Sequence, residues 1–471
     1  MLRADFFAFA AIFVLCAQAS ASERRGVPAD VVRLACQFLE STDATARQAL
    51  AAQLDASACD PLAVVWALRP EPAEDAKTGY FPAHHFRVPE LRAKHPDDLL
   101  YTVVPKSYRP DTPTGLVVFM HGGGSGSKRT APDRYMRMDG KGNALGNEFD
   151  RAGLIAVGPS APWNDKCHTR WCLPEADDYI RDVILECQAR YNIDPNRVVL
   201  MGHSMGGFGA YHQVQRQPDH FAAVISSAGS WYLACWPVIH GTPLWMVHGA
   251  RDAQPGKRPH YTDVAFPREA HRLLTEQHVP HEYREHPDTH ALDEARHIVR
   301  EFLARVPKLR RDPCHPCVVC VTPRGWSASQ FYPAPHNRWL SILGTTKGVI
   351  AYDHLVPKGP RQSWDMPIEN WKGWQLVHSR RTFLGAMAEA VNQGDNRFDV
   401  TTRNVRRFGI WLHPRMVDLA KPVRVVVNGK LAFDAHVKPS VSAALRSFER
   451  RRDWGLIYNA ELQIDVAPTA N

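Results

Sequence analysis

A serine between glycines stands where it could act as a nucleophile. Residues 198–212 are VVLMGHSMGGFGAYH, with Gly202 and Gly206 two positions before and after Ser204. The aliphatic run before the serine is typical of a strand, and helix-forming residues follow it. A sharp turn between them would raise the serine oxygen above a sheet, at a helix N-terminus that favours negative charge. The alternative is a serine in an ordinary glycine-rich loop, so the chain must also supply a base, an acid and an oxyanion hole.

A second glycine-rich segment could supply the oxyanion hole. His121-Gly122-Gly123-Gly124 directly follows the apolar residues 116–120. Glycines let backbone N–H groups approach a substrate oxygen closely, and we expect the N–H of Gly123 or Gly124 to act with that of Met205. A phosphate-binding loop is the first alternative, but no Lys-Ser/Thr pair follows at the right spacing. A plain flexible turn is the second.

A carboxylate follows a later strand pattern. Asp252 in PLWMVHGARDAQP lies just beyond the apolar residues 244–248. A carboxylate there can hold an imidazole in one tautomer and stabilise its charged form. Asp263 is the rival, and a role in helix capping or on the surface is the expected one for it.

Several histidines could be the base. His290 in HEYREHPDTHALDEARHIVREFL (281–303) lies in a loop after a strand pattern and directly before a helix pattern. His286 lies at the strand end and is restricted by Pro287, and His297 is expected on a helix face. The geometry therefore favours His290, which gives the chain order Ser, Asp, His.

These residues need a framework of alternating strands and helices to position them. The strand patterns cover 99–104, 116–120, 154–158, 198–201, 222–227, 244–248 and 281–285. The helix patterns cover 175–190, 205–217, 266–278 and 291–305. Short apolar strands between helices predict an α/β fold with a mostly parallel sheet covered on both faces. Functional loops of such sheets gather at the carboxyl ends of the strands.

The pattern changes on both sides of this region. We expect a signal peptide at 1–21, an N-terminal helical segment and linker at 22–80, and the α/β catalytic domain at 81–308. Residues 309–395 form a connecting region rich in Trp and Pro, with no sustained period, and 396–471 predict a β-rich domain. Asn428-Gly429 between two apolar runs is a strong hairpin signal.

The first residues indicate export. Arg3 precedes the apolar run FFAFAAIFVLCA, and AQASAS then offers small residues for cleavage. We expect a secreted or periplasmic protein, the alternative being an uncleaved anchor. No other stretch could span a membrane.

Export favours disulfide bonds among the cysteines. The natural pair is Cys36 with Cys59, and Cys167 and Cys172 share one loop. CHPCVVC (314–320) could be a metal site completed by His315 or His336, but disulfides plus one thiol are the more ordinary interpretation.

The net charge of +8 does not by itself indicate a nucleic-acid partner. No nucleic-acid motif accompanies the basic runs at 308–312 and 448–453, which are expected to be solvated faces. We therefore expect no nucleic-acid partner.

Residues 98–306 resemble a known group of enzymes. YNIDPNRV, GHSMGG and PDHFAAV, supported by PLWMVHGARD and HGGG, are similar to the esterase and polyhydroxybutyrate-depolymerase-like α/β-hydrolases, which include feruloyl and acetylxylan esterases and predicted secreted peptidases. The resemblance implies Ser204, Asp252 and His290 as a triad that transfers an ester or amide acyl group to water, with no metal or other cofactor. Thr289 stands where relatives often have glycine.

The substrate is less defined than the chemistry. We expect a carboxylic ester, with polysaccharide- or polyester-linked esters as candidates. Trp163 and Trp231 follow strand ends and could line the pocket, and ordinary packing is the alternative for each. The rival functions are a serine peptidase and a non-catalytic envelope protein that kept the fold.

Overall fold

The computed structural model describes residues 26–72, 77–123, 127–161, 170–252, 262–323, 335–358 and 375–467. The predicted signal peptide lies outside these residues. None of the helices in the described ranges is long and apolar enough to cross a membrane.

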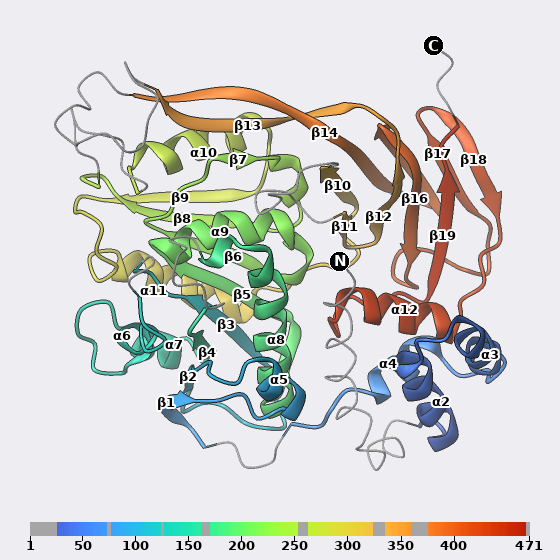
Figure 1. Ribbon diagram of the computed structural model, residues 1–471, viewed down its shortest axis with the longest axis horizontal. Coiled ribbons are helices and arrows are strands. Elements are labelled where there is room, and N and C mark those ends of the chain that lie inside the picture. Colours follow the sequence, from blue (N-terminus) through green and yellow to red (C-terminus); the bar gives the residue numbers. More distant parts are fainter. Residues whose placement is uncertain are drawn as a thin grey trace.

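An eight-stranded sheet forms the framework of the α/β region (Figure 1). Its strand order is β1-β2-β4-β3-β5-β6-β8-β9; the β1–β2 and β2–β4 pairs are antiparallel and the others are parallel. The strands are β1 (Gly79–His84), β2 (Leu100–Val104), β3 (Thr114–Met120), β4 (Ile155–Pro159), β5 (Ile193–His203), β6 (Ala223–Ser227), β8 (Leu244–Gly249) and β9 (His281–His286).

Helices cover both faces of this sheet because successive strand side chains point to opposite faces. Val118 and Met120 of β3 pack on the side of α8, α9 and α10, and Val117 and Phe119 pack on the side of α6, α7 and α11. The helices are α5 (Pro89–Lys94), α6 (Asp133–Met136), α7 (Gly146–Arg151), α8 (Pro174–Arg190), α9 (Met205–Arg216), α10 (Ala265–Glu276) and α11 (Arg296–Arg305). Short 3₁₀ helices are η4 (Arg170–Cys172), η5 (Pro218–His220), η6 (Trp236–Ile239) and η7 (Val306–Lys308).

The observed elements confirm the predicted α/β class and its strand patterns. All seven predicted strands are present, and β1 was not predicted because its sequence, GYFPAH, contains a proline and does not alternate. α11 begins at Arg296 and not at residue 291, because residues 292–295 form turns. These turns leave His290 in a loop and not at a helix N-terminus.

The N-terminal helices pack against a helix near the end of the chain. These helices are α2 (Ala29–Glu40), α3 (Ala44–Asp55) and α4 (Pro61–Ala67). They share a hydrophobic cluster with α12 (Val441–Arg451), whose Phe448 stacks 4.2 Å from Trp454. Figure 1 shows the blue helices beside α12 at the lower right. The two ends of the chain therefore form one helical layer.

The C-terminal third is β-rich, as predicted. One sheet has the order β18-β17-β15-β14-β13-β7, with β10 paired to β14, and a second has the order β11-β12-β16-β19. The strands are β7 (Leu233–Ala234), β10 (Cys317–Pro323), β11 (His336–Asn337), β12 (Leu340–Thr345), β13 (Val349–Lys358), β14 (Gln375–Gly394), β15 (Arg397–Arg403), β16 (Val405–Leu412), β17 (Val423–Val427), β18 (Lys430–Ala435) and β19 (Ala460–Asp465). Asn428-Gly429 makes the β17–β18 turn, which confirms the predicted hairpin.

This β-rich part is continuous with the α/β region. β7, which lies between β6 and β8 in the chain, pairs with β13. The long β13–β14 hairpin crosses above α10 in Figure 1. Strands from 309–395 and from 396–471 share both sheets, so the two predicted stretches fold together.

The predicted pairing of Cys36 with Cys59 does not form, and Cys167, the partner predicted for Cys172, lies outside the described residues. Cys59 is a free thiol, so it is not bonded to Cys36. It directly precedes Asp60, whose carboxylate caps α4 and fixes the chain there. Cys314 and Cys317 are also free thiols. Cys317 and Cys320 lie three positions apart on β10, so their side chains point to opposite faces and cannot converge on one ion or one bond.

Candidate active site

A strained turn holds Ser204 between β5 and α9. Ser204 has φ 56° and ψ −117°, a conformation that costs on the order of 1–3 kcal/mol for a residue with a side chain. Its N–H donates to the carbonyl of Ser227 on the neighbouring strand β6, at 2.9 Å. The serine therefore stands at the carboxyl end of β5, where the N-terminal end of α9 begins.

The flanking glycines are required by close backbone contacts. A Cβ at Gly202 would lie 2.0 Å from the carbonyl oxygen of Gly206, and one at Gly206 would lie 1.9 Å from that of Met120. Both contacts are with backbone and cannot be relieved by a side-chain rotation. The spacing of glycines around Ser204 is thus a packing requirement of this turn.

A chain of two hydrogen bonds joins the serine to a histidine and an aspartate. Ser204 Oγ lies 3.0 Å from His290 Nε2, and His290 Nδ1 lies 2.7 Å from Asp252 Oδ2. The His290 side chain is 39% exposed and that of Asp252 is 13% exposed, so the imidazole faces solvent while the carboxylate is shielded. The structure brings together the three residues that the sequence singled out.

Two further groups contact the Asp252 carboxylate. His248 Nε2 lies 3.3 Å from Oδ2, and the Thr262 hydroxyl donates to Oδ1 at 3.2 Å. Burial raises the pKa of Asp252, but the hydrogen bonds from His248 and His290 outweigh it and hold that pKa well below its ordinary value. The carboxylate therefore stays ionised beside the imidazole.

The loop that carries His290 is fixed from both sides. A Cβ at Gly249 would lie 1.8 Å from the carbonyl oxygen of Thr289, so only glycine lets the loop pack against the end of β8. On the other side, the N–H of Thr289 donates to Glu294 Oε2 at 2.8 Å. Thr289 replaces the glycine expected from the resemblance without displacing His290.

Backbone contacts also hold the glycine segment after β3. Gly122 lies against Ser204, because a Cβ on Gly122 would be 2.9 Å from the Cβ of the serine. The buried His121 ring contacts the carbonyls of Gly122 and Ser160 at 2.9 and 3.2 Å. Gly123 has φ 117°, which favours glycine. The loop at Gly122–Gly123 thus lies directly beside Ser204.

The other predicted site residues lie elsewhere or outside the described ranges. Trp231 is 1% exposed, packs 5.0 Å from Trp236, and donates its indole N–H to the Phe266 carbonyl at 2.9 Å. That burial leaves it almost no surface for a substrate. Gly124 and Trp163 lie outside the described residues.

The rival acid and base candidates occupy other positions. Asp263 accepts the N–H of Ala265 at the start of α10, at 2.8 Å. His286 is buried at the end of β9, and His297 is exposed on α11. The contact with Ser204 Oγ comes from His290.

Sequence reasoning missed three residues near this site. His248 and Gly249 end β8 and contact Asp252 and Thr289 as described above. His203, which precedes the serine, is buried with its ring 5.1 Å from that of His290. Burial, with the nearby His290, holds the pKa of His203 well below its ordinary value, so this ring adds no charge beside the base. The only available signal was that these residues adjoin the predicted acid and nucleophile.

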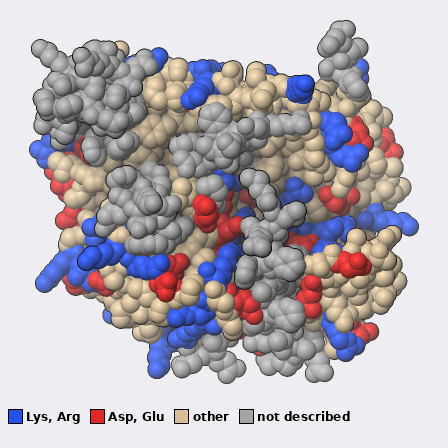
Figure 2. Space-filling view, in the orientation of Figure 1, with Lys and Arg blue, Asp and Glu red and all other residues tan. Residues whose placement is uncertain are grey.

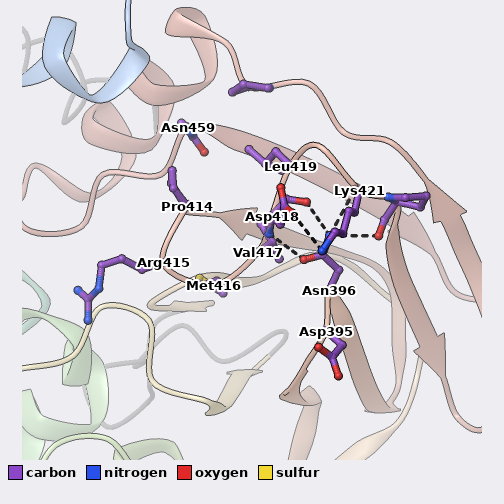
Figure 3. A pocket seen from close by; sticks show the side chains of 12 residues that line it. Asp395, Asn396, Pro414, Arg415, Met416, Val417, Asp418, Leu419, Lys421 and Asn459 are labelled. Carbon is purple, nitrogen blue, oxygen red and sulfur yellow. Dashed lines mark hydrogen bonds and ion pairs between the residues drawn. The ribbon is translucent and has the colours of Figure 1, made fainter.

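A separate cavity of about 890 Å³ lies in the β-rich part (Figure 3). It is lined by Asp395, Asn396, Pro414, Asp418 and Asn459, among others. Figure 3 shows the Asn396 amide bonded to the 418–422 loop; its Nδ2 donates to the Asp418 carbonyl at 2.7 Å. Since Asn396 is committed to the loop, the cavity indicates no particular ligand.

The visible surface mixes charges of both signs. Figure 2 shows basic and acidic side chains interspersed over this face, with no single-sign field covering it.

A comparison with protein families agrees with the topology. Residues 111–312 match a family model described as serine aminopeptidase, S33. With the sheet order and the turn at Ser204, this match shows that the region has the α/β-hydrolase fold.

Comparison with individual proteins gives distant similarities. The chain is 28% identical over 105 residues to the bifunctional acetylxylan esterase/xylanase XynS20E of Neocallimastix patriciarum, a match to 22% of this chain and 15% of that protein. Among solved structures, a thermostable esterase is 21% identical over 45% of this chain and 60% of its own, with a TM-score of 0.35. S-formylglutathione hydrolase FrmB from Staphylococcus aureus is 15% identical over 50% of this chain and 98% of its own, with a TM-score of 0.36.

Proposed function

We propose that this protein is an exported serine hydrolase that cleaves carboxylic esters through Ser204, His290 and Asp252. The observation that supports it most is the unbroken hydrogen-bond chain from Ser204 Oγ through His290 to Asp252, at a strained turn after a central parallel strand. A serine, an imidazole and a shielded carboxylate in this order supply a nucleophile, a base and a group that orients the base.

In the proposed mechanism His290 moves the proton. Its Nε2 takes the proton of the Ser204 hydroxyl as Oγ attacks the ester carbonyl. Asp252 accepts the Nδ1–H of His290, fixes the tautomer and stabilises the imidazolium. The same Nε2–H then protonates the leaving alcohol. A water that His290 activates in turn releases the acid from Ser204.

Backbone N–H groups would hold the oxyanion. Met205 is the first residue of α9, so its N–H is one of the first-turn donors without a partner inside the helix. Gly123, in the loop held beside Ser204 by His121, and Gly124 are the candidates for the second donor. Removing one such donor typically costs about 10²–10³ in kcat.

The substrate class is proposed as an ester on a polysaccharide. The curated relative is named for an acetylxylan esterase activity, and that similarity is the basis for the choice. The chain spans 15% of that relative's length. The N-terminal 21 residues suit an exported enzyme, which would meet such a polymer outside the cytoplasm.

The nucleophile is tested by labelling and by turnover. Wild-type protein should react with a fluorophosphonate, and mass spectrometry should place the adduct on Ser204. Ser204→Ala should lose the label and cut p-nitrophenyl acetate turnover by about 10⁴ or more, while Ser379→Ala on β14 keeps both. Unchanged turnover in a folded Ser204→Ala protein would refute the proposal and leave the non-catalytic alternative.

A serine peptidase is the second candidate, favoured by the description of the matching family model. An ester and an amide with the same acyl group decide between the two. We expect kcat/KM to be much larger for the ester, with acetylated xylan oligomers deacetylated. Amide cleavage at comparable efficiency, lost in Ser204→Ala, would make the protein a peptidase. A panel with feruloyl and hydroxybutyrate esters then separates the ester classes.

A further inference from the structure

Two buried side chains and a partly buried one converge at the junction between the α/β and β-rich parts. Asp219 and His220 form η5, which follows the end of α9, and His336 begins β11. One potential ligand atom from each of them lies within 4.8 Å of those of the other two. Asp219 and His220 are only 1% and 2% exposed.

Two of these side chains leave polar atoms unused. Asp219 Oδ2 accepts the N–H of Arg338 at 2.8 Å, but Oδ1 has no hydrogen-bond partner among the described residues. In the same part of the chain, Nε2 of His220 also lacks one. A buried polar atom without a partner costs free energy, so two of them on adjacent residues indicate something that the protein atoms do not supply.

The second nitrogen of His220 is held as in metal sites. Nδ1 lies 3.1 Å from Asp453 Oδ2, and Asp453 is held in turn by the Arg311 guanidinium. A metal-ligating histidine usually donates its other N–H to a carboxylate, which fixes the ring and leaves one nitrogen for the ion. Asp453 would thus orient His220 without being a ligand.

We propose that Asp219, His220 and His336 bind a divalent transition-metal ion, with Zn²⁺ as the best match, that ties the α/β region to the β-rich region. Two imidazoles and one carboxylate suit Zn²⁺, and a buried water completes a tetrahedral set. Ligand atoms at about 2.0–2.2 Å from a tetrahedral ion lie about 3.3–3.6 Å apart. Atoms that lie within 4.8 Å of one another would therefore reach such a set by side-chain movements of about 1 Å.

The surrounding charges bear on the affinity of this site. Arg338 and Arg451 are both buried nearby. Arg338 donates to the Gly241 and Asp312 carbonyls, and Arg451 Nε donates to the Arg338 carbonyl, while Arg451 Nη1 has no hydrogen-bond partner among the described residues. Their positive charge weakens cation binding relative to a site without them.

The position of the cluster makes its role structural. Ser204 caps the N-terminal end of α9 and η5 follows its C-terminal end. A helix of 12 residues is about 18 Å long. An ion at η5 is therefore too far from Ser204 to polarise the ester, but it would connect η5 with β11 and, through Asp453, with the segment after α12.

Metal content is the first test. The mature chain, purified without a histidine tag and dialysed against metal-free buffer, should retain one zinc ion per chain by plasma mass spectrometry. Dipicolinate should remove the ion and lower Tm, and Zn²⁺ but not Mg²⁺ should restore it. Co²⁺ in place of Zn²⁺ should give the visible absorption of a tetrahedral site.

Variants then locate the ion. His336→Gln should lose the bound metal, and Asp453→Asn should weaken Zn²⁺ affinity by about 10–100-fold. As a control, His436→Gln removes an exposed histidine from the β-rich part. It should change neither the metal content nor the Zn²⁺ affinity. Ester turnover at 25 °C should be the same with and without the ion, which separates this proposal from that for Ser204.

Two results would overturn the proposal. One is a chain that holds no metal and gains no Tm from added Zn²⁺ or Co²⁺, which would mean that an ordered water alone fills the cluster. The other is equal Zn²⁺ binding by wild type and a folded His336→Gln protein, which would place the ion elsewhere.

Discussion

The contact between Gly249 and the loop carrying His290 allows a direct test of how the base is positioned. In Gly249→Ala, the new Cβ would stand 1.8 Å from the carbonyl oxygen of Thr289, whereas ordinary van der Waals contact begins at 3.4 Å. The loop must therefore retreat by about 1.6 Å, and backbone cannot rotate away as a flexible side chain would. His290 is the next residue in the chain.

The expected cost follows from that displacement. Ser204 Oγ and Asp252 Oδ2 lie 3.0 and 2.7 Å from the two nitrogens of His290, so a shift of this size breaks at least one of the bonds. Misplacing a reacting group by 1 Å costs about 10²-fold, and losing the carboxylate's hold on the imidazole costs about 10⁴-fold. We expect kcat/KM for p-nitrophenyl acetate to fall between these limits, mainly through kcat.

The assay compares Gly249→Ala with Gly409→Ala. A Cβ at Gly409, on β16, would meet only side-chain atoms, of Leu343 at 3.3 Å and of Glu461 at 3.7 Å, and should leave turnover unchanged. Circular dichroism and Tm establish that both variants are folded. A folded Gly249→Ala protein with wild-type kcat would refute the claim that this glycine positions His290, without bearing on the role of Ser204.

Three further predictions concern the surroundings of the site and the joining of the chain ends. In His248→Phe the Asp252 carboxylate loses the Nε2–H of His248, which lies 3.3 Å from Oδ2 and 2.6 Å from the Thr262 carbonyl. Because this N–H is shared, kcat/KM should fall by about 10-fold, and an unchanged value in steady-state assays would show that His248 only packs there. Burial lowers the pKa of His121 from 6.5 to about 4, so below pH 6.5 the unfolded chain takes up a proton that the folded chain does not. The free energy of unfolding should therefore drop by about 2 kcal/mol by pH 5 because of this residue alone. Urea unfolding should show a shallower pH dependence for His121→Gln than for the wild type. Phe448→Ala should lower the free energy of unfolding by about 3–5 kcal/mol and expose α2–α4 to proteases. Phe433→Ala, at a partly exposed position, should do neither. Equal digestion of the two variants would contradict the packing of the N-terminal helices on α12.

The α/β framework could be predicted because its signals are local. Each parallel strand is a short aliphatic run, buried on both faces, between helices with an apolar stripe. Ser204 was the firmest expectation, since the glycines around it follow from backbone contacts within one strand–turn–helix unit. Asp252 and His290 follow strands that end at the same edge, so the topology brings them together.

The long strands of the β-rich part were harder to predict. β14 carries Ala386, Ala388 and Ala390 on its buried face, and these residues favour neither a strand nor a helix strongly enough to mark a period. The packing of α12 on the N-terminal helices joins residues about 400 positions apart, as in the ion pair of Arg47 with Glu449. No local pattern specifies such a contact.

The cluster at η5 shows the same limit for a site. Asp219 and His220 are adjacent within the PDHFAAV motif, but His336 comes from strand β11 over a hundred positions later, so no spacing marks the set. CHPCVVC offered the more familiar metal spacing, and yet a strand sends Cys317 and Cys320 to opposite faces. Spacing along the sequence marks a site only when one element carries all of its residues, as the turn between β5 and α9 carries Gly202, Ser204 and Gly206.

Helix α9 connects the two proposed sites and sets what each should respond to. Its N-terminal end carries Ser204, whose strained φ is maintained by the contacts of Gly202 and Gly206 with neighbouring backbone. Its C-terminal end leads into Asp219 and His220, which face the β-rich part. Because the contacts at Ser204 come from β3, β5 and β6, loss of an ion at η5 would leave them intact at low temperature. Metal removal should therefore shorten the half-life of activity on heating while leaving kcat at 25 °C unchanged; a fall in kcat at 25 °C without unfolding would show that the two ends of α9 are coupled.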